Sequence, residues 1–427
     1  MIIKHQQEEV IRKIAYQIEA CGGRAFYTGG CVRDYYLGIR IFHDLDIEIY
    51  QLSLEKLMTI LSGFGKCKIV GKSYPLIIVK GLKNIDFTLS QLASPYQQQP
   101  QRRDFTINAM MLDILTGEHI DPYHGLVDLR KQQIKHCEPG IFLQDPLRVY
   151  RGIELASRLR FEIHPVTRNM MNKTDCSALP GERVFIELSK ILLNSPQPGR
   201  GLEMMREMNL IKRHHPVLQA MMGAPMRNDR DSIWHHTIRA INIAAGLKEY
   251  TSAPRNYMLA VLLHATGRSI SSDPWYYPRE SRRIAADFLL NLRTGKRICQ
   301  EVCNLVEKHM HPLCYYEKPL MVNRKTITKL NNQINLEDLL MLTQAVLTSC
   351  GQEVKFQAIR AWLMQQVSYL GLTINQAVPA IITGKDLIAI GLTPGPVFRT
   401  LLDCAYELQL EGYSYADIMK NITIIKP

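Results

Sequence analysis

Residues 44–49 alternate between acidic and apolar side chains, and this period constrains the fold more than any other feature of the chain. Two interleaved sets make up the segment: Leu45, Ile47 and Ile49 on one side, and Asp44, Asp46 and Glu48 on the other. Successive side chains of a strand point to opposite faces, so the period predicts a strand with one buried face and with both aspartates on the other face. The stretch 28–34, which contains Gly29 and Gly30, precedes it and predicts a turn that opens a helix.

Two carboxylates held close together on one face of a sheet have a specific chemistry. They repel each other unless a cation lies between them, and hard oxygen ligands suit Mg²⁺. Backbone N–H groups at a glycine turn can approach a phosphate closely. An Asp-x-Asp pair by itself is more often part of a solvated face, but metal-binding carboxylates beside a phosphate cradle indicate a nucleotidyl-transfer site.

Composition limits the class of protein. A chain of 427 residues exceeds a single core, so two to four domains are expected. No run of 18 apolar residues and no secretory signal is present, which predicts a cytoplasmic protein with no membrane span and with ten reduced cysteines. The net charge of +12 and the pI near 9.1 favour a polyanionic partner such as RNA, although a basic pI alone is weak evidence.

The first part of the chain mixes helical and strand patterns. We expect helices at 4–20, 30–38 and 53–63, and strands at 25–27, 44–50, 67–71, 76–80 and 85–89. This alternation indicates a small α/β domain that ends near residue 138.

After residue 138 the pattern is almost wholly helical. Asp145-Pro146 predicts a helix start, with Asp145 as the cap and Pro146 in the first turn. Breaks with Pro or Gly near 180–181, 195–199 and 223–225 separate further helices, and a last helical segment is expected from 383–386 to about 420.

A second set of dense motifs follows the strands. Two adjacent arginines, Arg102 and Arg103, stand beside Asp104 and Asn108, and together they offer a triphosphate clamp and partners for ribose hydroxyls. Three further motifs come later, at 121–129, 144–151 and 182–188.

In this order, over roughly residues 20–210, the motifs resemble the class II branch of the nucleotidyltransferase superfamily, which holds the bacterial tRNA CCA-adding enzymes and the poly(A) polymerases. The resemblance implies an α+β head with a five-stranded polymerase-β-like sheet, followed by all-helical neck, body and tail domains. We place the head at 1–138, the base-selecting neck at 139–215, the body at 216–345 and the tRNA-binding tail at 346–427.

The resemblance also implies residue roles. Asp44 and Asp46 would be catalytic and bind Mg²⁺. The remaining nucleotide-binding residues would hold the triphosphate and the ribose region: Gly29, Gly30, Arg33, Arg103, Asp104, Asn108 and Arg151, with Asp145 and Arg148 at the base. In the tail, Lys385 and Arg399 are candidate contacts for tRNA phosphates, although helix caps and turns explain the glycines around them equally well.

A physical argument for Asp145 and Arg148 is independent of the resemblance. Three residues apart at a helix start, they face the same way. Cytosine and adenine both present an amino donor beside a ring-nitrogen acceptor, which suits a carboxylate and a guanidinium. Uracil and guanine present the opposite polarity, at a cost of about 1–3 kcal/mol per lost contact. The alternative to base selection is that Asp145 and Arg148 form an ordinary surface ion pair.

Some positions depart from the family pattern. Gln144 replaces the usual Glu before Asp145, for which we expect weaker rather than lost base selection. Glu154 stands where a further Arg or Gln is common, and Thr88-Leu89-Ser90-Gln91 lacks the basic residue that often follows this strand. Both changes bear on triphosphate affinity.

The middle of the chain resembles a degenerate HD phosphohydrolase domain. His236 matches its first histidine and His309 a later one, but the defining His-Asp pair is His264-Ala265, and another expected histidine is replaced around 278–281. Loss of a bridging metal ligand predicts that the fold is retained and phosphohydrolase activity is lost.

These observations predict a tRNA nucleotidyltransferase that adds or repairs the 3′-terminal CCA from CTP and ATP without a nucleic-acid template, by a two-metal mechanism. Glu48 is expected to be a solvated residue rather than one that orients Asp46. The alternatives are a poly(A) polymerase, a partial enzyme that adds only CC or only A, and a catalytically weakened RNA-binding relative. No protein partner can be inferred.

Overall fold

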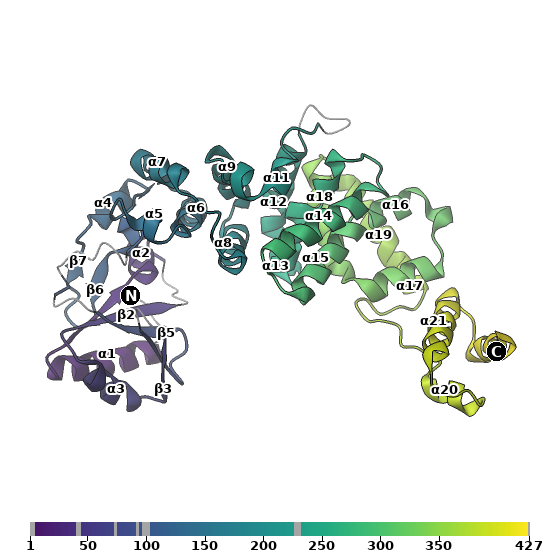
Figure 1. Ribbon diagram of the computed structural model, residues 1–427, viewed down its shortest axis with the longest axis horizontal. Coiled ribbons are helices and arrows are strands. Elements are labelled where there is room, and N and C mark those ends of the chain that lie inside the picture. The colour runs from purple at the N-terminus through teal and green to yellow at the C-terminus, as the bar shows by residue number, and fades with distance from the viewer. Residues whose placement is uncertain are drawn as a thin grey trace. The chain divides into compact units, whose positions relative to one another are not determined.

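The computed structural model describes residues 5–39, 44–71, 75–90, 94–95, 103–225 and 232–425. The chain forms two compact units, residues 1–179 (unit 1) and 180–427 (unit 2). Unit 1 contains the sheet and the first helices of the predicted neck, and unit 2 is helical (Figure 1). The boundary between the units falls inside the predicted neck, and the division into four domains stays a prediction.

Unit 1 is built around a mixed sheet whose strand order is β3-β4-β5-β2-β1-β6-β7. The strands are β1 Arg24–Thr28, β2 Leu45–Tyr50, β3 Cys67–Val70, β4 Leu76–Val79, β5 Ile85–Leu89, β6 Met111–Asp113 and β7 His119–Ile120. The expectation of five strands was therefore too low for this sheet. The two additional short strands form a hairpin beside β1, too short to show a strand period in the sequence.

Strand β2 lies inside the sheet, antiparallel to β1 and parallel to β5. In this register Asp46 is opposite Thr28 of β1 and opposite Asp86 of β5. A strand with neighbours on both sides is fixed in register by two sets of hydrogen bonds, so the acidic end of β2 is held firmly.

Helices of unit 1 cover the sheet. The helices before residue 138 are α1 His5–Ala20, α2 Gly30–Tyr36, α3 Leu54–Ser62, the 3₁₀ turn η1 Thr106–Asn108 and α4 Gly125–Arg130. Helix α1 buries Ile11, Ile14 and Ile18, spaced at three and four residues, and lies beside α3, as Figure 1 shows. Ser53 caps α3 by accepting a hydrogen bond from the Lys56 N–H.

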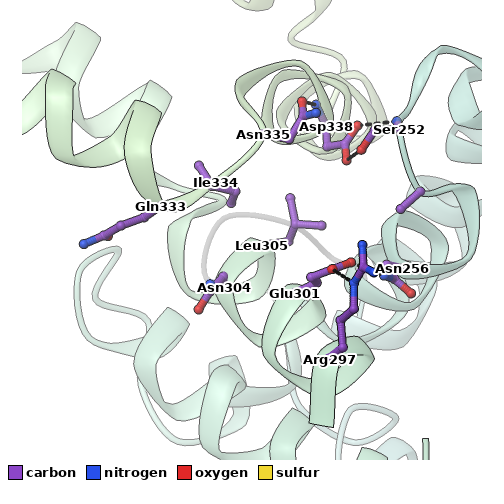
Figure 2. Close-up of a pocket in the computed structure, with 11 residues that line it drawn as sticks. Ser252, Asn256, Arg297, Glu301, Asn304, Leu305, Gln333, Ile334, Asn335 and Asp338 are labelled. Carbon is purple, nitrogen blue, oxygen red and sulfur yellow. Dashed lines mark hydrogen bonds and ion pairs between the residues drawn. The ribbon is translucent and has the colours of Figure 1, made fainter. Parts of the chain in front are cut away.

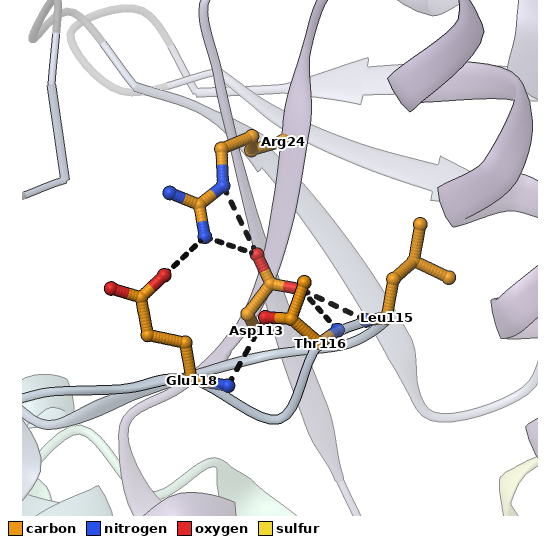
Figure 3. Close-up of polar contacts among 5 residues, drawn as sticks. All are labelled: Arg24, Asp113, Leu115, Thr116 and Glu118. Carbon is orange, nitrogen blue, oxygen red and sulfur yellow. Dashed lines mark hydrogen bonds and ion pairs between the residues drawn. The ribbon is translucent and has the colours of Figure 1, made fainter.

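A buried ion pair ties the β6–β7 hairpin to β1 (Figure 3). Arg24 contacts both Asp113, at 2.6 Å, and Glu118, at 2.7 Å. The other carboxylate oxygen of Asp113 accepts the backbone N–H groups of Leu115 and Thr116. These contacts hold the hairpin turn in place at the edge of the sheet.

The rest of unit 1 is helical apart from two short parallel strands, β8 Gln133–Ile134 and β9 Glu162–Ile163. Its helices are α5 Ile141–Gln144, α6 Arg148–Leu159 and α7 Pro165–Lys173. The predicted helix start was wrong by two residues, since α6 begins at Arg148 and Leu147, not Asp145, is its N-cap residue. The Asp145 carboxylate instead accepts the Leu147 N–H in the turn between α5 and α6.

Unit 2 is built from helices. They are α8 Gly181–Asn194, α9 Pro198–Glu207, α10 Leu210–His214, α11 Pro216–Gln219, α12 Ile233–Leu247, η2 Lys248–Tyr250, α13 Pro254–Leu263, η3 Thr266–Ser269, α14 Tyr277–Asn291, α15 Lys296–Lys308, α16 His311–Glu317, η4 Pro319–Met321, α17 Arg324–Gln333, α18 Leu336–Ser349, α19 Glu353–Tyr369, α20 Gly384–Ala389, α21 Pro396–Glu411 and α22 Tyr415–Ile425. The predicted breaks at 180–181 and 195–199 are confirmed by the bounds of α8 and α9.

The end of unit 2 has its own small core. The single helical segment expected from 383–386 to about 420 is instead three helices, α20 to α22, that pack around Leu387, Leu401 and Ile418. Glycine and proline at 391–396 interrupt the segment, because Pro396 occupies the first turn of α21 and cannot continue a preceding helix.

Within the described residues, the longest apolar helices fall short of what a membrane crossing requires. All ten cysteines are free thiols.

Candidate active site

The two aspartates of β2 lie on its solvent-facing side. Asp44 immediately precedes the strand and Asp46 is its second residue, and both are exposed, whereas Leu45 and Ile47 are buried. The alternation expected from the sequence therefore holds at this end of β2, and both carboxylates face the same way.

The glycine turn lies directly against this pair. Gly29 has φ 74°, a conformation that favours glycine, and it precedes α2, which begins at Gly30. A Cβ atom at Gly29 would stand 3.2 Å from the Asp46 Oδ2 atom. The residue thus permits both the turn and the close approach of the backbone to the carboxylate, which places the N-terminus of α2 beside the acidic pair.

A third carboxylate, Asp86, belongs to the same place and was missed by the sequence reasoning. It is opposite Asp46 in the parallel register of β2 and β5. Burial, and after it the negative charge of Asp44, raises the pKa of Asp86. The only local signal was the alternation Ile85-Asp86-Phe87, and nothing in it indicates the register of the two strands.

Glu48 corrects an expectation. The sequence favoured a solvated residue, but Glu48 is 1% exposed and forms an ion pair with Arg103. Since Glu48 follows Asp46 at strand spacing, the Arg103 guanidinium covers the same face of β2 as the aspartates. A buried carboxylate needs such a partner, because desolvation of an unpaired charge is costly.

Asp104 is the centre of a hydrogen-bonded network. Its Oδ2 atom accepts a hydrogen bond from Nε of Arg151 at 2.8 Å. Its Oδ1 atom accepts hydrogen bonds from the Phe105 N–H at 2.7 Å and from the Asn108 side-chain amide at 3.2 Å. Burial works to raise the pKa of Asp104, but the charge of Arg151 and these donors outweigh it and hold that pKa below its usual range. The pair connects the motif at 103–108 to helix α6.

The network continues to the helix that the glycine turn opens. Asn108 Oδ1 accepts a hydrogen bond from Nη1 of Arg33 at 2.6 Å, and Arg33 also forms an ion pair with Asp34 at 2.7 Å. Arg33 is 3% exposed, and burial lowers its pKa, with Arg158 acting in the same direction. The structure therefore brings together Gly29, Gly30, Arg33, Arg103, Asp104, Asn108 and Arg151 by direct contacts or adjacency in the chain.

Asp145 and Arg148, which the sequence predicts to select the base, lie in the turn before α6 and at its first residue. Both Asp145 and Arg148 are partly exposed, and Arg148 Nη1 lies 3.4 Å from the Ile141 carbonyl oxygen, which accepts its hydrogen bond. Arg151, one turn further along α6, carries the ion pair to Asp104. Helix α6 thus carries Arg148 and the tie of Arg151 to the motif at 103–108, and Asp145 lies in the turn just before this helix.

The structure shows where Gln144 and Glu154, two of the departures from the family pattern, are located. Gln144 ends α5 and is exposed, while Glu154 is buried in α6 and pairs with Arg158 at 2.9 Å. The charge that Glu154 adds is thus matched by an arginine one turn away, and both lie close enough to Arg33 to affect its pKa. Gln91 and Arg102 lie outside the described residues.

The other candidates belong to unit 2. Lys385 of α20 and Arg399 of α21 are exposed, and their contact with RNA stays a prediction. The HD-like histidines form a buried cluster, with His236 Nε2 and His264 Nε2 3.1 Å apart and the His309 ring 5.2 Å from that of His264. Ala265, where the resemblance to an HD domain leads us to expect an acid, is buried, and the assignment of this region stays a prediction.

The donor set of unit 1 suits a divalent cation that also binds a phosphate ligand. Throughout the part of the chain that the structure describes, no three His, Cys, Asp or Glu side chains are arranged to hold a metal ion. Two exposed carboxylates on one strand, with Asp86 raised in pKa beside them, are a partial oxygen site. Mg²⁺ is commonly held by one or two carboxylates, with substrate phosphates and water as its other ligands.

Comparison with protein families locates two matches. A model described as poly A polymerase head domain matches residues 78–135, and one described as a probable RNA- and SrmB-binding site of polymerase A matches residues 160–222. The first contains the motif at 103–108 and the second follows α6.

Similar proteins extend over more of the chain. A multifunctional CCA protein of Neisseria meningitidis serogroup C (strain 053442) is 31% identical over 284 residues, which are 60% of this chain and 64% of that protein. One of Pseudomonas fluorescens (strain SBW25) is 30% identical over 321 residues, 67% of this chain and 75% of that protein. The chain thus matches somewhat less than two thirds of the Neisseria protein.

Solved structures share the fold. A CCA-adding enzyme in complex with CTP has a TM-score of 0.63 at 20% identity, and covers 100% of this chain and 97% of its own. The Thermotoga maritima CCA-adding enzyme complexed with tRNA has a TM-score of 0.60 at 19% identity with the same coverage.

Proposed function

We propose, since this chain belongs to the family of CCA-adding enzymes and poly(A) polymerases, that it is a nucleotidyltransferase that adds or repairs the 3′-terminal CCA of tRNA. CTP and ATP are its substrates, and no nucleic-acid template is needed because side chains select the base. The similarity to multifunctional CCA proteins and the site in unit 1 both support this proposal.

The observation that carries the proposal is the position of the Gly29 turn against Asp46. A triphosphate bound at the N-terminus of α2 would have its phosphates next to both aspartates. Arg103, held by Glu48 on the same face, supplies positive charge beside them. The substrate 3′-hydroxyl would then attack the α-phosphate in line and release pyrophosphate.

Nucleotidyltransferases of this family use a divalent metal ion, and we propose Mg²⁺ for this chain. Asp44 and Asp46 would hold it, and when bound it neutralises charge on the phosphates and makes the attacking hydroxyl more acidic. Asp86 supports the proposal by its position, because it lies opposite Asp46 in the register of β2 and β5 and adds a third carboxylate beside the pair.

Base selection is assigned to Asp145 and Arg148. The carboxylate would accept the amino group of cytosine or adenine, and the guanidinium would donate to the adjacent ring nitrogen. Arg151 holds Asp104 and thereby fixes α6 relative to the motif at 103–108. tRNA is the proposed acceptor, and the net charge of +12 supports attraction of its phosphates.

An incorporation assay tests the proposal. The purified full chain is incubated with Mg²⁺ and either a tRNA transcript that lacks CCA or an unstructured RNA, with CTP, ATP, both, or UTP and GTP. We expect two C residues with CTP alone and complete CCA with both nucleotides. Long A tails on unstructured RNA without any C incorporation would instead identify a poly(A) polymerase, and CC or A addition alone would identify a partial enzyme.

The variant Asp44→Ala is the matched control for chemistry. It should abolish incorporation, because the exposed carboxylate is lost from the proposed cation site, and should retain tRNA binding. If wild type and variant incorporate equally little while both bind tRNA, the chain is an RNA-binding relative and the proposal is wrong.

A further inference from the structure

Unit 2 carries a cluster of aromatic rings at its surface, far in sequence from the acidic pair of unit 1. Trp275 lies 5.5 Å from the ring of His311 and 6.0 Å from the ring of Tyr315, and the latter two rings are 5.2 Å apart. Trp275 itself is 39% exposed. Of the three tryptophans in the chain, Trp234 is buried and Trp362 is half-buried, so the exposed indole is exceptional.

The exposed indole is held in a fixed turn. Asp273 Oδ1 accepts the backbone N–H groups of Trp275 and Tyr276, each at 2.8 Å. The next residue, Tyr277, is buried and donates its hydroxyl to His309 Nε2 at 2.7 Å. The turn is therefore anchored on one side by the core and on the other by the Asp273 carboxylate, so little entropy is lost when a ligand stacks on the ring.

A hollow of about 360 Å³ adjoins these rings, between α15, α16 and α17. Its lining holds three ammonium groups, two aromatic side chains, polar groups and one aliphatic residue, and no carboxylate: Lys308, Lys325, Lys329, His311, Tyr315, Asn323, Thr326, Gln333 and Leu330. Burial lowers the pKa of His311 to about 4, so this ring is neutral and adds no charge of its own near pH 7.

The lysines have carboxylate partners at the surface. Lys325 and Lys329 contact Glu407 of α21, Lys325 also contacts Glu411, and Lys308 lies 3.6 Å from Glu307. The side chains of Glu407 and Glu411 are more than 40% exposed, and solvated pairs of this kind contribute little. An incoming phosphate can therefore compete for the ammonium groups.

Two more hollows lie along α15 and α17. Gln333 and Lys308 also line a second hollow of about 530 Å³, and Gln333 and Asn304 line a third of about 400 Å³, shown in Figure 2. The walls of the third are rich in amides and ion pairs, among them Arg297 with Glu301. Gln333 lines all three hollows, which together are called the polar groove below. The carboxylates of Glu307, Glu301 and Asp338 also line the second and third hollows.

We propose that Trp275, with Tyr315 and the lysines of the adjoining hollow, binds an unstacked nucleobase and its phosphate. A flat exposed indole accepts the face of any base, ammonium groups accept phosphate, and the amides of the groove can bond sugar hydroxyls of neighbouring nucleotides. RNA is the source of the base in this inference, which for that choice rests on the proposed function. A free nucleotide offers the same chemistry, and the experiment separates the two.

The first experiment measures RNA affinity by fluorescence anisotropy of labelled RNA with the full chain. The probes are a tRNA transcript, a single-stranded RNA of ten cytidines and a blunt RNA duplex. We expect Trp275→Ala to weaken binding of the single strand by about tenfold or more, and Trp275→Phe to lose less. The control Tyr369→Ala removes another ring, 85% exposed, and should bind like wild type. Equal affinity of Trp275→Ala and wild type for the single strand would overturn the inference.

The second experiment observes the indole itself. In a Trp362→Phe background, the exposed Trp275 is the main emitter open to quenching, because Trp234 is buried. The single strand should quench it and the duplex should not. Quenching by millimolar CTP or ATP alone would add free nucleotides as a source of the base, while a signal unchanged by every probe would overturn the inference.

The outcome is separable from that of the proposed function. The aromatic cluster is tested by affinity and quenching, which need no catalysis and can be repeated in Asp44→Ala. If CCA addition fails but Trp275→Ala still weakens RNA binding, only the proposed function falls. If CCA addition succeeds and affinity does not depend on Trp275, only this inference falls. A circular dichroism melt verifies that each variant is folded.

Discussion

In unit 1 two buried carboxylates of the candidate site are paired with arginines, whereas in unit 2 the buried histidines of the cluster are neutral and bonded to one another and to the backbone. Glu48 pairs with Arg103, and Asp104 pairs with Arg151. By contrast His264 donates Nδ1–H to the Val261 carbonyl, which leaves its Nε2 atom to accept a hydrogen bond from His236. The two clusters thus solve the problem of burying polar groups in different ways.

The difference bears on what each cluster can do. The Glu48–Arg103 pair lies on the same face of β2 as Asp46 and fixes the guanidinium there. In the histidine cluster the ring nitrogens are already engaged, since His309 Nδ1 donates to the Val306 carbonyl and its Nε2 accepts from Tyr277. Ala265, next to His264 in the chain, is buried, and the loss of phosphohydrolase activity stays a prediction.

The largest expected effect tests the charged cluster. Glu48→Gln removes a carboxylate that is 1% exposed and leaves Arg103 unpaired, so we expect unit 1 to lose about 3–5 kcal/mol of stability. Hydrogen exchange of the β1 and β2 amides measures this loss. The double variant Glu48→Gln/Arg103→Met should recover part of it, and a change below about 0.5 kcal/mol in the single variant would show that the pair is not buried as described.

The second prediction tests the neutral cluster through pH. Burial lowers the pKa of His264 to about 4 and those of His236 and His309 well below 6.5, so the unfolded chain binds more protons than the folded one. Stability is then complete above pH 6.5 and is lost as pH falls from 6.5 toward 4. Between pH 7.5 and 5.5 the loss is about 1.4 kcal/mol for each histidine.

Tryptophan fluorescence during urea unfolding measures this loss, because all three tryptophans belong to unit 2. His264→Gln should reduce the dependence on pH, and His235→Gln, which replaces an exposed neighbour of the cluster, should leave it unchanged. A stability of unit 2 that is constant from pH 7.5 to 5.5 would contradict the neutral histidine network.

The third prediction concerns the selection of the nucleotide base in unit 1 and depends on the proposed function. Asp145→Asn should lower kcat/KM for CTP and ATP by about tenfold and raise incorporation of UTP, because an amide can donate as well as accept. Steady-state incorporation with single nucleotides measures both effects. Asp175→Asn, at an exposed aspartate of the same unit, is the control. Unchanged discrimination between CTP and UTP would remove Asp145 from base selection.

The smallest expected effect is the stability contributed by an exposed ion pair, for comparison with the buried pairs of unit 1. Glu118 contacts Arg24 but its side chain is 41% exposed, so Glu118→Gln should change the stability of unit 1 by less than about 0.5 kcal/mol. The same hydrogen-exchange measurement as for Glu48→Gln applies. A loss as large as that of Glu48→Gln would mean that burial does not separate strong pairs from weak ones here.

Local pattern was sufficient for much of the fold. The strand at 85–89 and the helix after Gly29-Gly30 agree with the structure to within two residues, because side-chain period and turn residues are properties of short segments. Prediction from local pattern was wrong where one residue type suits two local structures. Asp145 was expected to cap a helix, but its carboxylate closes a turn two residues earlier, since aspartate suits both positions.

The candidate site divides in the same way. The common face of Asp44 and Asp46 and the turn beside them follow from the sequence alone, because strand geometry and glycine conformation act over a few residues. Tertiary structure alone decided that Asp86 lies opposite Asp46 and that Glu48 is buried against Arg103, 55 positions away. Strand register and long-range burial depend on how the whole sheet packs, and no short stretch of residues contains that information.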